Sequence, residues 1–352
     1  MNYPINKRVK NLDLIITDST NHHLQKLVGK PDSCLASSLK LLGKLIIVRN
    51  IDILSRFFRI KTIRIPDKFP QAIEIIKQNF PSINIDDYRG ADNYSNTDTN
   101  GDHKIFVKEI HPIGTGNFGT IPLLKSESHK ITIDKNRLVQ IPIDFILYRK
   151  PFLENEHIFL QTFNMIIYPW DFLRVTQEIL FEEVKETRVS PNASVAKSCI
   201  IEGPCIIEDG VRIDDFAKIK GPTYIGKDSF IGMGSLVRNC MLENKTRIGF
   251  NCEIGKSYFA GNDKISHHNV ILDSIIGENV WFGGYSGTAN VLLDRQNVKY
   301  RIDDTLVNTG MDHFGAIVGN NSAVGASVII LPGRKIQPSS TIQAGTIVGK
   351  DY

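Results

Sequence analysis

The sequence predicts an α/β domain followed by a parallel β-helix built from six-residue repeats. In the C-terminal half, aliphatic residues recur at every sixth position in two stretches. The first stretch holds Val195, Ile201, Ile207, Ile213, Ile219, Ile225, Ile231 and Val237, and the second holds Val318, Val324, Ile330, Ile336, Ile342 and Val348. The N-terminal half instead alternates short apolar runs with segments of helical periodicity. Two such patterns in succession indicate two differently built domains, at residues 1–185 and 186–352.

A period of six fits neither the 3.6-residue period of a helix nor the alternation of a long strand. It fits a solenoid in which each unit is one short strand and one turn. Three units would complete a triangular coil with its aliphatic residues pointing inward, and stacked coils would form three parallel sheets at about 4.8 Å per coil. Glycines suit the tight turns at the corners. They stand at Gly226, Gly232, Gly249, Gly277, Gly319 and Gly325.

The first domain is predicted to contain βαβ units around a parallel sheet, because strand and helix patterns alternate. The expected strands are residues 12–17, 61–65 and 83–85, and the expected helices are residues 34–42, 46–58 and 71–79. The polar residues 90–104 predict a loop. A further helix should run from Pro169 to about residue 183 and lead into the β-helix, because proline suits a first helical turn.

Composition excludes several classes of function. The net charge of +4 over 352 residues favours neither nucleic acid nor membrane binding. Apolar runs are too short to span a bilayer, and no secretion signal is recognisable at the N-terminus. Five cysteines without a CxxC spacing indicate reduced thiols and a cytoplasmic protein, and no metal site is expected.

Several segments of the second half match the pattern of a known family. They are Tyr168-Pro169-Trp170-Asp171, Lys220-Gly221-Pro222-Thr223-Tyr224-Ile225-Gly226, Lys264-Ile265-Ser266-His267, residues 273–280, Thr288-Ala289-Asn290, Asn308-Thr309-Gly310 and residues 314–319. They resemble the archaeal sugar-1-phosphate nucleotidylyltransferase/N-acetyltransferase family, relatives of the bifunctional glucosamine-1-phosphate acetyltransferase/uridylyltransferases. The resemblance is continuous over residues 165–350 and weaker over residues 12–65. It implies a left-handed β-helix, whose hand the spacing alone does not fix, after a Rossmann-like nucleotidylyltransferase-like domain.

The resemblance implies an acetyltransferase that uses acetyl-CoA as acyl donor and a sugar phosphate or nucleotide sugar as acceptor. A neutral amine must attack the thioester, and a histidine is suited to accept its proton. His267 aligns with the catalytic histidine of the family. The other candidates are Arg238, Lys256 and Lys264 for substrate phosphate, and Gly284, Asn290, His313, Ala326 and Ala344 for acetyl-CoA. Val270 and Trp281 replace the Tyr and Asn that bind sugar in the family, which leaves the acceptor open.

The expected nucleotide-binding loop of the first domain argues against nucleotidylyltransferase activity. Phosphate-cradling loops need glycine for close backbone approach and positive φ, and residues 17–24 contain none. Family members resemble one another in forming trimers, so a homotrimer is expected, with the insertion at residues 289–316 as an arm toward a neighbour. Two alternatives remain open: a non-catalytic regulatory or scaffold subunit that serves a catalytic paralogue, and an active sugar-1-phosphate nucleotidylyltransferase.

Overall fold

The computed structural model describes residues 9–17, 39–55, 58–67, 69–88, 130–131, 138–142, 152–154, 157–159 and 168–351. The chain divides into two compact units. The first unit holds the first strand and the elements between residues 46 and 166. The second unit holds everything from residue 167 onward and also residues 38–45, which come from the other end of the sequence.

A four-stranded sheet lies in the first unit. Its strands, in spatial order, are β5 (Asn84–Tyr88), β4 (Phe58–Pro66), β1 (Val9–Thr17) and β7 (Leu138–Pro142). All neighbours pair in parallel, as the alternating pattern of strands and helices predicted. A separate antiparallel sheet contains β6 (Lys130–Ile131), β9 (His157–Phe159) and β8 (Phe152–Glu154).

Two helices accompany this sheet, α3 (Ile46–Ser55) and α4 (Pro70–Asn79). Helix α4 begins at a proline and buries Ala72, Ile73 and Ile76, which lie on one face at helical spacing. Helix α3 is shorter than predicted because β4 already begins at Phe58. The strand predicted over residues 83–85 instead runs from Asn84 to Tyr88.

The helix predicted over residues 34–42 is wrong at its C-terminal end. Residues Lys40–Leu41 form β2, which pairs antiparallel with β3 (Lys44–Leu45). Leu42 and Gly43 form the turn with φ of 53° and 79°, and glycine tolerates this region best. A hairpin therefore replaces the helix end. Residues 34–38, the glycine-free loop at 18–24 and the loop predicted at 90–104 lie outside the described residues.

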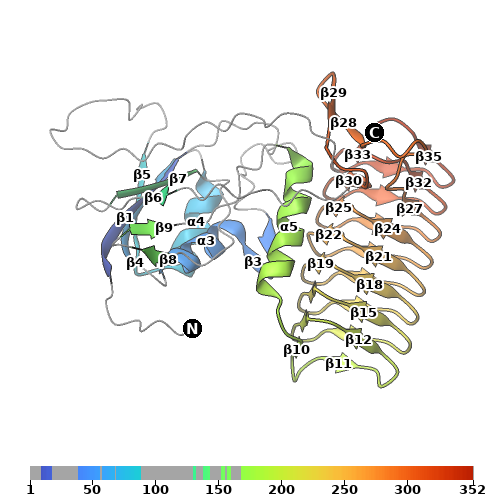
Figure 1. Cartoon of the computed structure of the whole chain (residues 1–352), viewed down its shortest axis with the longest axis horizontal. Coiled ribbons are helices and arrows are strands. Elements are labelled where there is room, and N and C mark those ends of the chain that lie inside the picture. Colours follow the sequence, from blue (N-terminus) through green and yellow to red (C-terminus); the bar gives the residue numbers. More distant parts are fainter. Residues whose placement is uncertain are drawn as a thin grey trace. The chain divides into compact units, whose positions relative to one another are not determined.

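The second unit is dominated by a parallel β-helix whose coils stack along one axis (Figure 1). The first sheet contains β10 (Arg188–Val189), β13 (Cys205–Ile207), β16 (Thr223–Ile225), β19 (Met241–Leu242), β22 (Tyr258–Phe259), β25 (Ile275–Ile276), β30 (Ala316–Val318) and β33 (Arg334–Ile336). The second contains β11 (Ser194–Val195), β14 (Arg212–Ile213), β17 (Phe230–Ile231), β20 (Arg247–Ile248), β23 (Lys264–Ile265), β26 (Trp281–Phe282), β31 (Ala323–Val324) and β34 (Thr341–Ile342). The third contains β12 (Ile200–Glu202), β15 (Lys218–Lys220), β18 (Leu236–Arg238), β21 (Glu253–Gly255), β24 (Val270–Leu272), β27 (Gly287–Thr288), β32 (Ile329–Ile330) and β35 (Ile347–Val348). The prediction of three parallel sheets from the six-residue period is confirmed.

The repeating aliphatic residues form the core of the β-helix, where almost all are completely buried. The strict spacing stops at Val237 because the middle coils are one residue shorter. Partners on adjacent coils are 18 residues apart at Ile207 and Ile225, but 17 apart at Ile225 and Leu242. The missing residue belongs to the corner between the third and first sheets, so Leu242 follows Val237 by five positions. The inward stack continues unbroken despite this change.

Buried polar side chains line the corners of the coils. Ser235 Oγ accepts the N–H of Cys252 at 2.9 Å, and Asn269 Oδ1 accepts the N–H of Ser286 at 2.9 Å. Ser286 Oγ in turn accepts the N–H of Val328 at 3.0 Å. Each of these side chains satisfies a buried backbone donor of the following coil.

The outward side of the first sheet is covered by other parts of the second unit. Helix α5 (Pro169–Glu183), predicted from its proline start, packs Phe172 edge-on against Tyr258 at a centroid distance of 4.8 Å. The β2–β3 hairpin contacts the same sheet, because Tyr258 Oη donates to the Lys40 carbonyl at 3.0 Å. A Cβ on Gly43 would collide with the Tyr224 hydroxyl, so this turn also needs glycine for close approach. Tyr224 and Tyr258 are consequently buried.

Glu243 is the polar anchor of the hairpin turn. Its carboxyl oxygens accept the Gly43 N–H at 3.0 and 3.2 Å, and the residue is completely buried. Burial raises the pKa of Glu243 to about 8, although the Gly43 N–H and the charge of Lys40 act in the opposite direction. In the unfolded chain the same carboxyl ionises near pH 4.5. The native state therefore holds one more proton between these two pH values.

This difference predicts a pH-dependent effect of Glu243→Gln. Unfolding free energy falls with rising pH wherever the native state binds more protons, so wild type should lose stability from about pH 4.5 to about pH 8. Glutamine keeps an acceptor for Gly43 and cannot ionise. The variant should melt at a higher temperature than wild type at pH 9 and at nearly the same temperature at pH 5. Thermal unfolding at both pH values checks this, with the exposed Glu278→Gln as control. An equal shift at both pH values would contradict the assignment.

The insertion after β27 forms a second hairpin, β28 (Lys299–Ile302) and β29 (Thr305–Asn308), which projects at the end of the β-helix in Figure 1. Its base is attached to α5 of the same chain. The rings of Trp170 and Tyr300 meet at 5.5 Å, and Arg174 Nη2 donates to the Thr309 carbonyl at 2.5 Å. The hairpin is thus fixed at its base, while Leu306 near its tip is exposed.

Candidate active site

The turns between the second and third sheets form a continuous corner of the β-helix. In each of coils two to eight the third residue of the turn has positive φ, including His268 at 57° and Tyr285 at 60°. From Gly234 onward, the N–H of this third residue donates to the carbonyl of the second turn residue on the preceding coil, whereas the Phe216 N–H donates to Ser198 Oγ at 3.1 Å. His268 N–H donates to the Phe250 carbonyl at 2.9 Å, and Tyr285 N–H donates to the His267 carbonyl at 3.0 Å. This ladder fixes the order of the second turn residues along the corner.

Four of the site residues predicted from the sequence occupy this second turn position on successive coils. The ladder continues from Ser327 N–H to the Gly284 carbonyl at 2.9 Å and from Gly345 N–H to the Ala326 carbonyl at 2.8 Å. The resulting column is His267, Gly284, Ala326 and Ala344, which we call the corner ridge. One histidine is therefore followed by three residues with at most a methyl side chain. Such a ridge leaves room for an extended ligand along the axis.

His267 is exposed at the start of this run of small residues. Its Nδ1 accepts the Phe250 N–H at 3.2 Å. A neutral imidazole that accepts at Nδ1 carries its proton on Nε2, so Nε2 donates outward in this geometry. To accept a proton from a ligand, the ring must release the Phe250 N–H. Rotation of the imidazole ring about its side-chain bonds would release this N–H. Because the side chain is exposed, the rotation meets little steric resistance.

The neighbouring His268 is packed into the corner. Its ring stacks on Tyr285 at 4.8 Å and meets Phe250 edge-on at 5.2 Å. Its Nδ1 lies 3.2 Å from the Asn251 amide nitrogen. These contacts give His268 a structural role, because its ring packs between those of Phe250 and Tyr285 on the adjacent coils.

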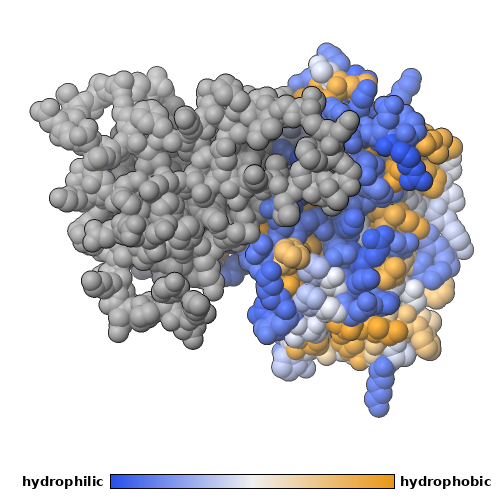
Figure 2. Space-filling view, viewed as in Figure 1, coloured by the Kyte–Doolittle hydropathy of each residue, from blue (hydrophilic) through white to orange (hydrophobic). Residues whose placement is uncertain are grey.

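Apolar side chains at this corner are exposed to solvent, mostly on the coils that precede the corner ridge. The exposed fraction is 70% for Phe216 and 66% for Tyr285, and Met233 and Phe250 are also exposed. Figure 2 shows apolar residues gathered over the first coils on the face in view.

A second group of predicted residues lies at the corner between the third and first sheets, around Asp273. Asp273 is 8% exposed, and its Oδ2 accepts the Asn290 amide N–H at 2.6 Å. Burial raises the pKa of Asp273, while the Asn290 hydrogen bond and the charges of Lys256, protonated His313 and Arg238 oppose this. Asp273 was not among the site residues predicted from the sequence, although it stands inside the segment that carries the family resemblance.

The predicted cations are partly engaged with their own chain. Arg238 Nη2 forms an ion pair with Glu253 Oε1 at 2.9 Å, and His313 Nδ1 lies 3.0 Å from Asp312 Oδ1. Lys256 is exposed at the same corner. The third cation, Lys264, lies on a different side, where it faces outward from the second sheet.

One chain does not gather all the predicted residues into one pocket. His267 and Asp273 stand at opposite ends of β24, so they belong to different corners of the same coil. The structure therefore brings His267, Gly284, Ala326 and Ala344 together at one corner, and Arg238, Lys256, Asn290 and His313 together at another. Lys264 belongs to neither group.

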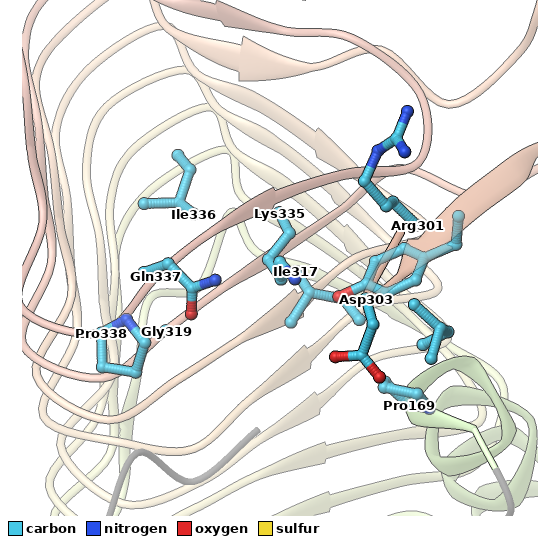
Figure 3. Close-up of a pocket in the computed structure, with 11 residues that line it drawn as sticks. Pro169, Arg301, Asp303, Ile317, Gly319, Lys335, Ile336, Gln337 and Pro338 are labelled. Carbon is cyan, nitrogen blue, oxygen red and sulfur yellow. The ribbon is translucent and has the colours of Figure 1, made fainter. Parts of the chain in front are cut away.

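A cavity of about 270 Å³ lies at the base of the β28–β29 hairpin (Figure 3). It is lined by Pro169, Tyr300, Arg301, Ile302, Asp303, Ile317, Gly319, Lys335, Ile336, Gln337 and Pro338. In Figure 3 the Asp303 carboxylate points inward beside Pro169, whereas the Arg301 side chain points away. None of the predicted site residues lines this cavity.

Among the residues that the structure describes, no three His, Cys, Asp or Glu side chains are grouped so that they could hold a metal ion. Among the same residues, no helix combines the length and apolar character needed to cross a membrane.

Comparisons with known proteins define the class of this β-helix. Residues 204–239 match the family model described as "Bacterial transferase hexapeptide (six repeats)". The "Bifunctional protein GlmU" of Methanococcus aeolicus is 39% identical over 189 residues, which are 53% of this chain and 45% of that protein. The "Bifunctional sugar-1-phosphate nucleotidylyltransferase/acetyltransferase" of Sulfurisphaera tokodaii is 33% identical over 111 residues, 32% of this chain and 28% of that protein.

These matches confirm the resemblance predicted from the sequence. The chain carries the repeat of the hexapeptide transferases and is related to the archaeal bifunctional sugar-1-phosphate nucleotidylyltransferase/acetyltransferases. It spans less than half the length of these two relatives. A crystal structure of "UDP-N-acetylglucosamine acyltransferase" aligns to 46% of this chain and 70% of that one, with 15% identity and a TM-score of 0.29.

Proposed function

We propose that the chain is an acetyl-CoA-dependent acyltransferase that acts on an amino group of a sugar phosphate or nucleotide sugar. The observation that carries this proposal is the corner ridge, where His267 is followed by Gly284, Ala326 and Ala344 on successive coils. The similarity to a bifunctional sugar-1-phosphate nucleotidylyltransferase/acetyltransferase supports the same class of reaction.

The residues of the ridge fit the chemistry of acyl transfer. The acceptor amine attacks the thioester carbonyl, the carbon–sulfur bond breaks, and the thiolate of CoA leaves and takes up a proton. His267 accepts the proton that the nitrogen loses. Gly284, Ala326 and Ala344 would hold the pantetheine arm, because their small side chains leave the ridge open below the histidine. Asn290, His313 and the cations Arg238 and Lys256 would contact phosphate groups at the Asp273 corner.

The proposed assembly is a homotrimer with sites between neighbouring copies. The separation of His267 from the Asp273 corner supports it, because one copy would present its ridge to the other corner of the next. Exposed aliphatic residues on the third sheet, Val270, Ile329 and Ile347, supply an apolar surface for the contact. The β-helix is proposed to be left-handed, as the resemblance implies.

The N-terminal domain, residues 1–185, is proposed to be a Rossmann-like nucleotidylyltransferase-like domain without that activity, in a cytoplasmic protein. The glycine-free stretch at residues 17–24 supports this, because it lacks the residues that let a backbone cradle phosphates.

A non-catalytic scaffold subunit remains the second candidate, and one set of contacts favours it. Arg238 is paired with Glu253, Asn290 with Asp273, and His267 Nδ1 with the Phe250 N–H. Residues satisfied within their own chain can serve the fold alone.

The two candidates differ in whether CoA is released. Wild-type protein mixed with acetyl-CoA and amino-sugar phosphates or nucleotide-linked amino sugars should release CoA, detected with a thiol reagent. Acetyl-CoA should also raise the melting temperature, because it binds only the native state. Neither CoA release nor stabilisation would support the scaffold. Pyrophosphate release from a nucleoside triphosphate and a sugar 1-phosphate would instead support the nucleotidylyltransferase.

A further inference from the structure

A row of outward-facing side chains runs along the second sheet and contains three cations and two aromatic rings. Arg212, Phe230, Arg247, Lys264 and Trp281 occupy equivalent positions on five successive coils. Each is the register partner of the next. Because neighbouring strands lie about 4.8 Å apart, this cation–ring row is about 19 Å long.

The cations of the row are directed to solvent. Arg212, Arg247 and Lys264 are exposed and form no ion pair with any residue that the structure describes. The two arginines flank the ring of Phe230, with guanidinium–centroid distances of 5.6 and 5.0 Å. The row therefore keeps its positive charge available to an anion.

Among the described residues, neither Asp263 nor Glu278 forms an ion pair with Lys264. Asp263, which precedes Lys264, is completely buried and accepts the N–H groups of Val280 and Gly261. Glu278 accepts the Asn262 amide at 3.0 Å.

Trp281 gives the row an open aromatic face. Its side chain is 47% exposed, whereas the adjacent Phe282 is buried in the core. Within the described residues the indole contacts no other ring and no cation. An exposed tryptophan beside unpaired cations is the arrangement that stacks a base and holds its phosphates.

The row ends beside the candidate active site. Lys264 precedes His267 by three residues, which is about 10 Å along the chain. A sugar 1-phosphate has one ring and one phosphate, so it cannot occupy His267, two cations and the indole together. A nucleotide sugar offers a sugar amine, two phosphates and a base in sequence.

We propose that the cation–ring row binds a nucleoside diphosphate group, with the base stacked on Trp281 and the phosphates on Lys264 and Arg247, so that the acyl acceptor is a nucleotide sugar. This inference rests on the proposed function and selects one of its two acceptor classes. It also gives a role to the exposed side chain of Trp281.

Fluorescence titration of the full chain with UDP, dTDP, GDP, UMP and glucosamine 1-phosphate tests the row. The chain has two tryptophans, and Trp170 is buried, so a stacked base should quench Trp281. At least one nucleoside diphosphate should bind more tightly than glucosamine 1-phosphate. Trp281→Ala should weaken its binding, measured by calorimetry, by about 5- to 100-fold, and Trp281→Phe should restore most of it. Arg247→Ala and Lys264→Ala should also weaken it.

Two control variants are available, the exposed helix ring Phe181→Ala and the exposed cation Arg301→Ala, and neither should change binding. Diphosphate binding that is insensitive to Trp281→Ala, for example at the N-terminal domain, would refute the proposal that the cation–ring row is the binding site. Acetyl transfer to glucosamine 1-phosphate without diphosphate binding would refute the binding role of the cation–ring row and leave the proposed function standing. Binding that depends on Trp281 without CoA release from any nucleotide-linked amino sugar would overturn the proposed function instead.

Discussion

Replacement of His267 by alanine should lower the rate of acetyl transfer by about 10²- to 10⁴-fold and leave the affinity for acetyl-CoA nearly unchanged. Alanine removes the group that takes the proton from the acceptor nitrogen. It leaves Gly284, Ala326 and Ala344, the proposed contacts of the pantetheine arm, in place. Steady-state rates of CoA release and calorimetric titration with acetyl-CoA separate the two effects.

The matched control for this prediction is His268→Asn. His268 has a φ of 57°, and asparagine tolerates that region better than alanine does. Its ring stacks on Tyr285, so the change should lower stability slightly and the rate much less than His267→Ala does. An active enzyme indifferent to His267→Ala would refute the mechanism and leave the fold intact.

Replacement of Phe282 by alanine should lower the unfolding free energy by about 3–5 kcal/mol. Phe282 is completely buried, in register with Ile265 on one side and Val324 on the other. Alanine leaves a cavity between coils that flanking strands cannot close, because their backbone pairing fixes the spacing. Urea-induced unfolding followed by circular dichroism measures the loss.

The adjacent Trp281→Ala is the control for this core substitution. Trp281 is the neighbour of Phe282 on the same strand but points outward and is half exposed. Its removal should cost far less stability. Equal losses at the two positions would mean that the inward and outward assignment of β26 is wrong.

The sequence predicted the β-helix well because one local rule is repeated along it. Each inward aliphatic residue, from Val195 to Val237, packs against an equivalent aliphatic residue one coil away. The rule failed at Leu242, where the coil shortens by one residue at a corner. The spacing from Val237 to Leu242 is five residues and not six. The six-residue spacing then resumes at Leu242, Ile248 and Ile254.

The candidate site was only partly predictable from the sequence. His267 and Gly284 are 17 residues apart, but Ala326 follows only after the inserted hairpin, so spacing alone does not place all of them on one ridge. Arg238 and Lys256 lie near Asp273, whereas Lys264 lies on the second sheet. This placement depends on where each residue falls in its coil. The contact of Gly43 with Glu243 spans 200 residues and has no local signal at all.

The docking of the β2–β3 hairpin has a consequence for synthesis on the ribosome. Gly43 leaves the ribosome 200 residues before its partner Glu243 does. At about 5–20 residues per second, the hairpin waits roughly 10–40 s for that partner, and slightly longer for Tyr258. During this interval Leu39 and Leu41, buried in the finished protein, have no β-helix to cover them. A nascent chain halted before residue 243 should therefore expose this hairpin to chaperones and proteases, and one released after the fifth coil should protect it.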